Sequence, residues 1–554
     1  MDFKKKISSA IAKELNKKEG EINSLIEIPP ESSLGDYALP CFRLGVNPKL
    51  IAESIASKVK LDFIDKIETK GPYVNFFVDK KLFVENVLAE VLKSKKNYGK
   101  SKIGKEKVMV EYSQANTHKA FHVGHIRATS LGESISRVLE FSGNKVVRAN
   151  YQGDTGMHVA KWIWCYQKYH SNEKLKDDEG WIASIYVEAV KKLAENEYLQ
   201  KEVDVINQKL DSRKDKKLNE LWKKTRKLSL DSLEKVYQDL NTKFDKYFFE
   251  SQFEKRAKEI SKELVKKKIA EISDEATIIR LDEYNLGVWV LLRKDGTVLY
   301  SGKDIALAEE KFNKYKIDKS IYVVGKAQEM HFMQLFKTLE LMKFKQASKC
   351  RYVPVSEVRL PEGKMSSRTG DNILYSDFKK EIIDIVKKEI TQRGKLSGKA
   401  LEDRALAIAI ASMKYTMLSQ GINKGITFDK KEAIKFEGDT GPYLQYSYAR
   451  ACSILKKVKG KKSFEIPLLH DNEIKLIKRI SIFPDVVENV ARDLDPSGIA
   501  HYAHELAQSF NEFYNSCKVV GSEEESFRLK LVEAFKITLG NALFLLGIAA
   551  LEKM

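Results

Sequence analysis

Apolar residues near the N-terminus recur at the spacing of a helix face. Ile7, Ile11 and Leu15 lie four positions apart, as on the buried side of an amphipathic helix. A second helix is expected near 52–59, and GPYVNFFVD has the composition of a strand. This first part of the chain is predicted to form a small α+β domain.

A strand–helix–strand pattern begins after the polar connection at 93–107. VMVEYS (108–113) is predicted to be a buried strand. The helix after it has one apolar face, made by Ala128, Leu131, Ile135, Val138 and Leu139. Gly143 and the strand KVVRANY follow. Two strands joined in this way predict a parallel, doubly wound sheet.

The pattern changes twice more. Between Cys165 and about Tyr247 the chain is charged and helical, which predicts a helical insertion. Strand composition returns in WVLLRKDGTVLY and SIYVVG, and from Leu401 nearly every segment is helical in pattern. The expected fold is α/β, with an N-terminal α+β domain at 1–100, a Rossmann-like domain at 101–370 with its insertion at about 166–245, a helical connection at 371–429 and an all-helical domain at 430–554.

Composition adds a charge signal. The 554 residues are 43% hydrophobic and carry a formal net charge of +19, with a pI near 9.2. A positive field suits a polyanionic partner such as nucleic acid, although a protein at an anionic membrane surface would have the same totals. Most charged runs mix both signs and are expected to be solvated helix faces.

Several segments argue against other classes of protein. No apolar run reaches the roughly 18 residues of a membrane span, and 539–551 is interrupted by two glycines and an asparagine. Asp2 and Glu14 argue against a transit peptide, so we expect a cytoplasmic protein. The five cysteines are far apart, without CxxC or metal-ligand spacing, which predicts reduced cysteines and no zinc or other metal site.

The strongest chemical signal is NTHKAFHVGH, which ends in His122, Gly124 and His125. It lies between the first sheet strand and its helix, where unpaired N–H groups and the positive end of a helix favour phosphate. Two imidazoles three residues apart are suited to donating to phosphoryl oxygens. Glycine lets a flat base or sugar approach the backbone. In isolation, HxxH more often means a capping histidine beside a surface histidine, and a metal site would lack a third ligand.

A second signal is the polar loop GKMSSRTG, bounded by Gly363 and Gly370. It carries two positive charges and three hydroxyls, including Lys364 and Ser366, which suits a loop that closes on a triphosphate. In isolation it would be an ordinary basic turn.

Together, in this order, the two segments resemble the HIGH and KMSKS signatures of class I aminoacyl-tRNA synthetases. Longer stretches are similar to the arginyl-tRNA synthetase family: EYSQANTHKAFHVGHIRA, NYQGDTGMHVAKW, FDKYFFESQF, DGTVLYSGKDIALAEEKF, YVVGKAQEMHFMQLF and FEGDTGPYLQYSYARACSIL. LGDYALPCF resembles that family's additional N-terminal domain, and FNEFYNSCKV its anticodon-binding domain. The resemblance covers nearly the whole chain and is weakest in the insertion.

The resemblance implies a role for each matching residue, with ATP and L-arginine as substrates and Mg²⁺ accompanying ATP. The implied ATP-binding residues are Lys119, His122, Gly124, His125, Lys364 and Ser366. Those implied at the arginine amino and carboxylate groups are Ser113, Asn116 and Gln328, and those at the guanidinium are Glu111, Tyr300 and Asp304, with Glu250 as a further carboxylate. A carboxylate can bind a guanidinium bidentately. Without the resemblance, Tyr300 and Asp304 would suggest a core tyrosine and a helix N-cap.

The sequence departs from the family pattern at two places. Ser367 stands where KMSKS has its second lysine, and Lys119 is expected to supply that charge from the other side of the phosphates. The segment GDTGMH (Gly153–His158) differs from the commoner form with asparagine and glutamine, so the family implies no detailed contacts there.

The family also implies that the helical C-terminal domain binds the anticodon and the N-terminal domain the tRNA elbow. Candidate residues for stacking on bases are Tyr443, Tyr446, Tyr448 and Tyr514, each of which, taken singly, is more often a core residue. The expected protein is a monomer that binds tRNA(Arg), without a membrane partner.

Two other functions are considered. A class I synthetase for cysteine would need a zinc cluster, and one for glutamate a basic pocket where Asp304 stands. A non-catalytic relative that only binds tRNA or a protein is the alternative outside enzymes, and the intact His122, His125 and Lys364 argue against it.

Overall fold

The computed structural model describes residues 3–29, 32–101, 104–361, 373–394, 396–458 and 465–554. The chain forms two compact units. The first comprises residues 1–95, 457–481 and 512–537, and the second 96–456, 482–511 and 538–554. Among the described residues, no helix is both long and apolar enough to cross a membrane.

The N-terminal part of the first unit is a three-stranded antiparallel sheet with helices. Its strands, in the order β1-β3-β2, are β1 (Tyr37–Pro40), β2 (Ile64–Lys70) and β3 (Tyr73–Val78). Its helices are α1 (Phe3–Glu14), α2 (Glu19–Leu25), α3 (Pro48–Lys58) and α4 (Lys80–Ser94). Ile7 and Ile11 are fully buried, as their spacing predicts. The predicted α+β character is confirmed.

Five parallel strands form the centre of the second unit. In the spatial order β11-β10-β4-β5-β6, they are β11 (Cys350–Val355), β10 (Lys319–Gly325), β4 (Lys107–Glu111), β5 (Lys145–Gln152) and β6 (Lys246–Phe249). The chain runs from β4 to β5 and β6 on one side and returns to β10 and β11 on the other. The order therefore reverses between β4 and β10, and ligands of open α/β sheets bind at such a switch point, beyond the carboxyl ends of the strands. The predicted doubly wound sheet is confirmed.

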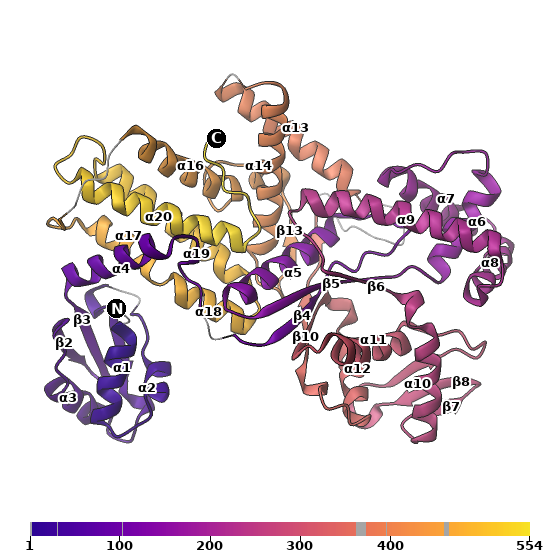
Figure 1. Ribbon diagram of the computed structural model, residues 1–554, viewed down its shortest axis with the longest axis horizontal. Helices are drawn as coiled ribbons and strands as arrows, with labels where there is room; N and C mark the ends of the chain where they lie inside the picture. The colour runs from indigo at the N-terminus through magenta and orange to yellow at the C-terminus, as the bar shows by residue number, and fades with distance from the viewer. Residues whose placement is uncertain (1–2, 30–31, 102–103, 362–372, 395, 459–464) are drawn as a thin grey trace. The chain divides into compact units, whose positions relative to one another are not determined.

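Helices cover both faces of this sheet (Figure 1), with α5 (Val123–Phe141) on one and α11 (Tyr300–Tyr315) and α12 (Glu329–Leu341) on the other. Because both faces are covered, the apolar run Val108–Val110 of β4 is buried throughout. Arg127 anchors α5, since its guanidinium donates to three backbone carbonyls beyond the sheet, those of Ser356, Lys424 and Gly421, at 2.9, 2.8 and 3.1 Å.

Four helices follow β5 in the region predicted to be a helical insertion. They are α6 (Met157–Tyr169), α7 (Glu179–Glu195), α8 (Gln200–Ser212) and α9 (Lys216–Asp239), and they share an apolar core that includes Trp162, Ile185 and Trp222. After β6 come α10 (Glu254–Lys266) and a small antiparallel sheet of β7 (Glu271–Ser273), β8 (Ala276–Arg280) and β9 (Val288–Leu292). The strand composition of WVLLRKDGTVLY thus belongs to β9, outside the parallel sheet.

The C-terminal part is almost entirely helical, as predicted. Its helices are α13 (Tyr375–Arg393), α14 (Gly398–Leu418), α15 (Lys430–Ala433), α16 (Gly441–Lys457), α17 (Asp471–Ser481), α18 (Phe483–Asp493), α19 (Ser497–Ser516) and α20 (Glu525–Leu545). The short strands β12 (Val358–Arg359) and β13 (Ile426–Thr427) pair in parallel.

Candidate active site

The segment between β4 and α5 ends in a reciprocal histidine cap. His122 is the N-cap of α5, and its Nδ1 accepts a hydrogen bond from the Gly124 N–H at 3.2 Å. His125 Nδ1 accepts one from the His122 N–H at 3.1 Å, and the rings stack with centroids 3.8 Å apart. A Cβ at residue 124 would lie 3.0 Å from His122 Cε1, so glycine leaves room for the ring. The capping role that HxxH suggests in isolation is therefore present.

These capping bonds decide where each ring carries its proton. A backbone N–H only donates, so Nδ1 of both histidines accepts and a neutral ring carries its proton on Nε2. Burial and Lys119 lower the pKa of His122 to about 4. Burial, His122 and Lys119 lower the pKa of His125 well below its usual value. Both rings are thus neutral near pH 7, and no residue in the described part of the chain accepts from either Nε2–H.

Lys119 lies close enough to the cap to act on the pKa of both histidines, and Lys161 lies close enough to act on Lys119. Neither lysine has a carboxylate partner among the described residues. Burial and the charge of Lys161 lower the pKa of Lys119. Burial and Lys119 also lower the pKa of His158 to about 3. A cationic group at the start of a helix, without counter-ions of its own, is an environment that anions bind. Sequence reasoning missed Lys161, although it lies within the family-like stretch NYQGDTGMHVAKW.

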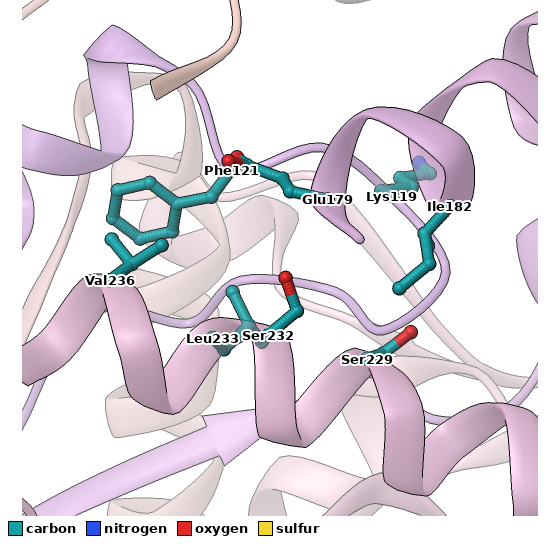
Figure 2. A pocket seen from close by; sticks show the side chains of 8 residues that line it. All are labelled: Lys119, Phe121, Glu179, Ile182, Ser229, Ser232, Leu233 and Val236. Carbon is teal, nitrogen blue, oxygen red and sulfur yellow. The ribbon is translucent and has the colours of Figure 1, made fainter. Parts of the chain in front are cut away.

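A small pocket adjoins Lys119 (Figure 2). It lies between the loop before α5 and the insertion helices α7 and α9, and its lining residues are Lys119, Phe121, Glu179, Ile182, Ser229, Ser232, Leu233 and Val236. Burial raises the pKa of Glu179 to about 7, although hydrogen bonds with Ser376 oppose the rise. Burial of the Lys119 ammonium at this pocket is the largest cause of its lowered pKa.

His118, inside the motif, joins the loop to α9. It is fully buried with φ +61°, and its ring nitrogens lie 2.9 Å from Thr117 Oγ1 and 2.8 Å from Thr225 Oγ1. Its backbone N–H donates to Ser229 Oγ at 3.0 Å. Burial, with smaller effects of His158 and Arg226, lowers its pKa to about 3. Both nitrogens are therefore occupied by hydroxyls, and the ring has a structural role.

Four carboxylates lie near enough to the Tyr151 hydroxyl, at the end of β5, to act on its pKa: Glu111, Asp154, Glu250 and Asp304. Burial, followed by the charges of these carboxylates, raises the pKa of Tyr151 well above its usual value. The hydroxyl is buried and has no hydrogen-bond partner among the described residues. Leaving a buried polar group unpaired costs roughly 1–3 kcal/mol. A ligand that bonds to this hydroxyl would remove that cost.

Three of the four carboxylates already have a cationic partner. Glu111 Oε2 lies 2.6 Å from Lys311 Nζ, Glu250 Oε2 lies 2.8 Å from Lys303 Nζ, and Asp154 Oδ2 lies 2.6 Å from Arg226. Burial raises the pKa of Glu250, and Lys303 opposes that rise. Each of these three pairs is therefore neutral as a whole.

Asp304 differs, because its partner is a histidine. His331 Nε2 lies 2.6 Å from Asp304 Oδ2, and His331 Nδ1 accepts from the Trp289 indole N–H at 3.3 Å. Since Nδ1 accepts, Nε2 carries the proton and donates to the carboxylate, which keeps its negative charge. The ring of Tyr300, 57% exposed, stands edge-on to His331 with centroids 4.7 Å apart. The N-cap of α11 is Leu299, so neither Asp304 nor Tyr300 caps the helix.

Comparisons with known proteins show the family to which the chain belongs. The family model described as tRNA synthetases class I (R), catalytic domain, matches residues 87–429. The chain is 38% identical to the arginine–tRNA ligase of Clostridium acetobutylicum, and the match covers 100% of both chains. The chain belongs to the class I arginyl-tRNA synthetase family.

Other matches extend this result. An arginyl-tRNA synthetase N-terminal domain matches residues 1–78, and a DALR anticodon-binding domain matches 444–554. The arginine–tRNA ligase of Clostridium perfringens is 37% identical over 100% of both chains. The arginyl-tRNA synthetase of Thermus thermophilus has the same fold, with a TM-score of 0.85, 24% identity and 100% of both chains covered. That of Plasmodium falciparum has a TM-score of 0.82 and 22% identity over 99% of this chain and 98% of its own.

Ser113, Asn116 and Gln328 are the residues predicted to lie at the amino and carboxylate groups of arginine. A Cβ at Gly153 would lie 2.2 Å from Asn116 Oδ1 and 3.2 Å from Glu250 Oε1, so glycine leaves room for both side chains. Ser113 has φ +60°, and its buried hydroxyl lies 2.6 Å from a threonine hydroxyl of α5. Gln328 is exposed beyond β10, across the switch point, and no contact within the described chain joins it to Asn116.

The segment Gly153–His158, which departs from the commoner sequence of arginyl-tRNA synthetases, is held by Asp154. Its Oδ1 accepts from the Ser251 N–H at 2.9 Å, and its backbone carbonyl accepts from the Trp222 indole N–H at 2.8 Å. His158 Nε2 lies 3.2 Å from the Gly153 carbonyl oxygen. Asp154 therefore connects the end of β5 to α9 and to the residues after β6.

The remaining predicted residues fall into two groups. Lys364, Ser366 and Ser367 lie outside the described residues. Of the four tyrosines, Tyr514 is 39% exposed and Tyr443, Tyr446 and Tyr448 are half-buried. The Tyr443 hydroxyl accepts from Asn511 Nδ2 at 2.7 Å, and that of Tyr446 accepts from Arg450 at 2.7 Å. Tyr514 thus offers the most accessible ring for stacking.

Proposed function

We propose that this chain activates L-arginine with ATP and joins it to the 3′-terminal adenosine of tRNA(Arg), releasing AMP and diphosphate. The observation that supports arginine most directly is Asp304, a charged carboxylate whose partner is a neutral histidine. A guanidinium is always protonated and presents a planar fork of N–H donors, which a carboxylate binds bidentately. The unpartnered Tyr151 hydroxyl would accept a further bond from the same group.

Activation would depend on positioning and on charge stabilisation. A carboxylate oxygen of arginine attacks the α-phosphorus, the bond to the bridging oxygen breaks, and diphosphate leaves with the electron pair, accompanied by Mg²⁺. Negative charge grows on the phosphoryl oxygens, where the Nε2–H groups of the two cap histidines, Lys119 and Lys161 would donate. We expect Lys364 and Ser366 to approach the triphosphate from the opposite side.

Transfer follows when the 2′-hydroxyl of the terminal tRNA ribose attacks the adenylate carbonyl and AMP leaves. We propose that residues 1–100 bind the tRNA elbow and residues 430–554 the anticodon, with Tyr514 as the first candidate for base stacking. The net charge of +19 suits a partner of many phosphates. A cytoplasmic monomer is part of the same proposal.

The pocket chemistry argues against the rival substrates. A glutamate side chain would bring a second negative charge to Asp304, which no described cation neutralises. A protein that only bound tRNA would have no need of two ring donors directed away from their own helix.

The test is exchange of labelled diphosphate into ATP with each proteinogenic amino acid, in the presence and absence of tRNA(Arg). We expect exchange with arginine alone, and appreciable exchange only when tRNA is added. Exchange with another amino acid, and none with arginine, would reject the proposal.

A further inference from the structure

Three donor atoms of different chemistry meet in the helical insertion, outside the site described above. Cys165 lies on α6, His170 is the C-cap that follows α6, and Glu188 lies on α7. The sulfur, a ring nitrogen and a carboxylate oxygen of these residues all lie within 4.8 Å of one another. The helices are joined nearby by a hydrogen bond from the Trp162 indole N–H to the Ile182 carbonyl at 2.8 Å, and they lie side by side in Figure 1.

The imidazole of His170 is already oriented for a ligand. Its Nδ1 lies 2.6 Å from Glu173 Oε1, and its Nε2 lies 2.8 Å from Glu188 Oε2. Glu173 is itself held, because its Oε2 accepts from the Trp181 indole N–H at 3.1 Å. A carboxylate that accepts from the second nitrogen of a histidine is the usual support of a metal-binding imidazole.

The thiol of Cys165 is a second, independent observation. The side chain is fully buried, and no residue of the described chain forms a hydrogen bond with its sulfur. A buried sulfur placed against an imidazole and a carboxylate has no role in the proposed reaction.

We propose that Cys165, His170 and Glu188 bind one Zn²⁺ ion, with water as the fourth ligand. Sulfur, nitrogen and oxygen ligands together favour zinc, at distances of about 2.0–2.3 Å. A tetrahedron of that size separates its donors by roughly 3.3–3.8 Å, so small side-chain movements are sufficient. The thiol proton and the Nε2 proton of His170 leave to solvent, and the thiolate and carboxylate balance the charge of the ion.

The neighbouring charges are compatible with this site. Lys192 lies 3.4 Å from Glu188 Oε1, which leaves Oε2 for the metal, and its ammonium sits 4.1 Å from the Tyr169 ring centroid. The ion would tie the end of α6 to α7. Because α6 also carries His158 and Lys161, zinc would stiffen the helix that brings these groups to the active site.

Metal binding is tested on the full-length protein after removal of metals with a chelator. Titration with Co²⁺ should give one equivalent bound, with a thiolate-to-cobalt charge-transfer band in the near ultraviolet, and Zn²⁺ should displace it and raise the thermal unfolding temperature. Cys165→Ser should abolish the band. Glu173→Gln, which replaces the carboxylate that supports His170 Nδ1 with a neutral amide, should weaken Zn²⁺ affinity about 10- to 100-fold.

Cys41→Ser is the matched control, because Cys41 is equally buried and has no histidine or carboxylate donors grouped with it in the described chain. It should leave both the band and the affinity unchanged. Circular dichroism checks that each variant is folded, and the wild-type titration decides the question by itself. No cobalt band in the wild-type protein, or a band that persists in folded Cys165→Ser, would overturn the proposal.

Discussion

Asp304 and His331 are joined by a hydrogen bond of 2.6 Å in which the carboxylate, and not the ring, carries the charge. The direction of this bond follows from Trp289, whose indole N–H can only donate to His331 Nδ1. The other carboxylates around Tyr151 are paired with lysine or arginine. Asp304 is thus the carboxylate of this group whose negative charge is available to bind a cationic substrate group.

Asp304→Asn should raise the KM for arginine by about 10- to 100-fold, because hydrogen bonds to charged groups contribute roughly 1.5–3 kcal/mol. The KM for ATP should change little. Glu310→Gln, on the same helix but in a surface pair with Lys314, is the control and should behave as wild type. Steady-state aminoacylation at varied arginine measures both, and an unchanged arginine KM in Asp304→Asn would remove this residue from the pocket.

Tyr151→Phe distinguishes a role of the hydroxyl in binding arginine from a role in the stability of the fold. It removes a hydroxyl that has no partner among the described residues, so the free energy of unfolding should stay the same or increase. The KM for arginine should rise about tenfold if the hydroxyl accepts from the guanidinium. Urea unfolding and aminoacylation are the two measurements. A less stable variant with a normal KM would mean that the hydroxyl has a structural role.

His122→Asn should retain the start of α5 but lose a donor. The asparagine oxygen can accept from the Gly124 N–H as Nδ1 does, whereas nothing replaces Nε2–H. Adenylate formation in a single turnover should slow by about 10²- to 10³-fold, the effect of removing one transition-state donor. Helical content by circular dichroism should not change. A rate close to wild type would exclude the His122 ring from the reaction.

Ser367 stands where the KMSKS signature has its second lysine, and a double-mutant cycle tests whether Lys119 supplies the missing charge. Lys119→Ala should slow activation about a hundredfold, roughly 2.7 kcal/mol, with arginine affinity little changed. Adding Ser367→Lys should restore part of the rate from the other side of the phosphates, so the two changes should not be additive. Single-turnover rates of the four proteins give the answer. Full activity in Lys119→Ala would contradict the idea, and loss without rescue would leave the exchange of positions unsupported.

Acid should destabilise the protein through His118. Its folded-state pKa of about 3 is below that of the unfolded chain, about 6.5. Between these two pH values the unfolded state binds more protons than the folded state. The contribution of His118 to stability is therefore complete above pH 6.5 and is lost as the pH falls toward 3. Urea midpoints at pH 7 and pH 5 should differ less in His118→Gln than in wild type. Equal differences in both proteins would assign the acid sensitivity to other groups.

Sequence patterns were sufficient for local features. The apolar segment VMVEYS predicts β4, and the helical spacing of the apolar residues after it predicts α5. Together they place His122 and His125 at the carboxyl edge of the sheet. Such patterns do not predict the pairing of Asp304 with His331. These two residues are 27 positions apart, and they meet only because α11 and α12 pack together. The neutralisation of Glu111 by Lys311 likewise requires the tertiary fold. For the same reason, the spacing of single cysteines gave no sign of Glu188 beside Cys165.

The division of charge across the switch point has a consequence for selectivity. Unpaired cations lie toward α5 and α6, and an unneutralised carboxylate lies at α11. Such a field orients a molecule that has a cation at one end and an anion at the other before the molecule contacts the protein. Citrulline matches arginine in shape but has a neutral side chain. Asp304 would therefore not attract its side chain electrostatically. We therefore expect the proposed arginine site to discriminate against citrulline through charge, without any steric clash.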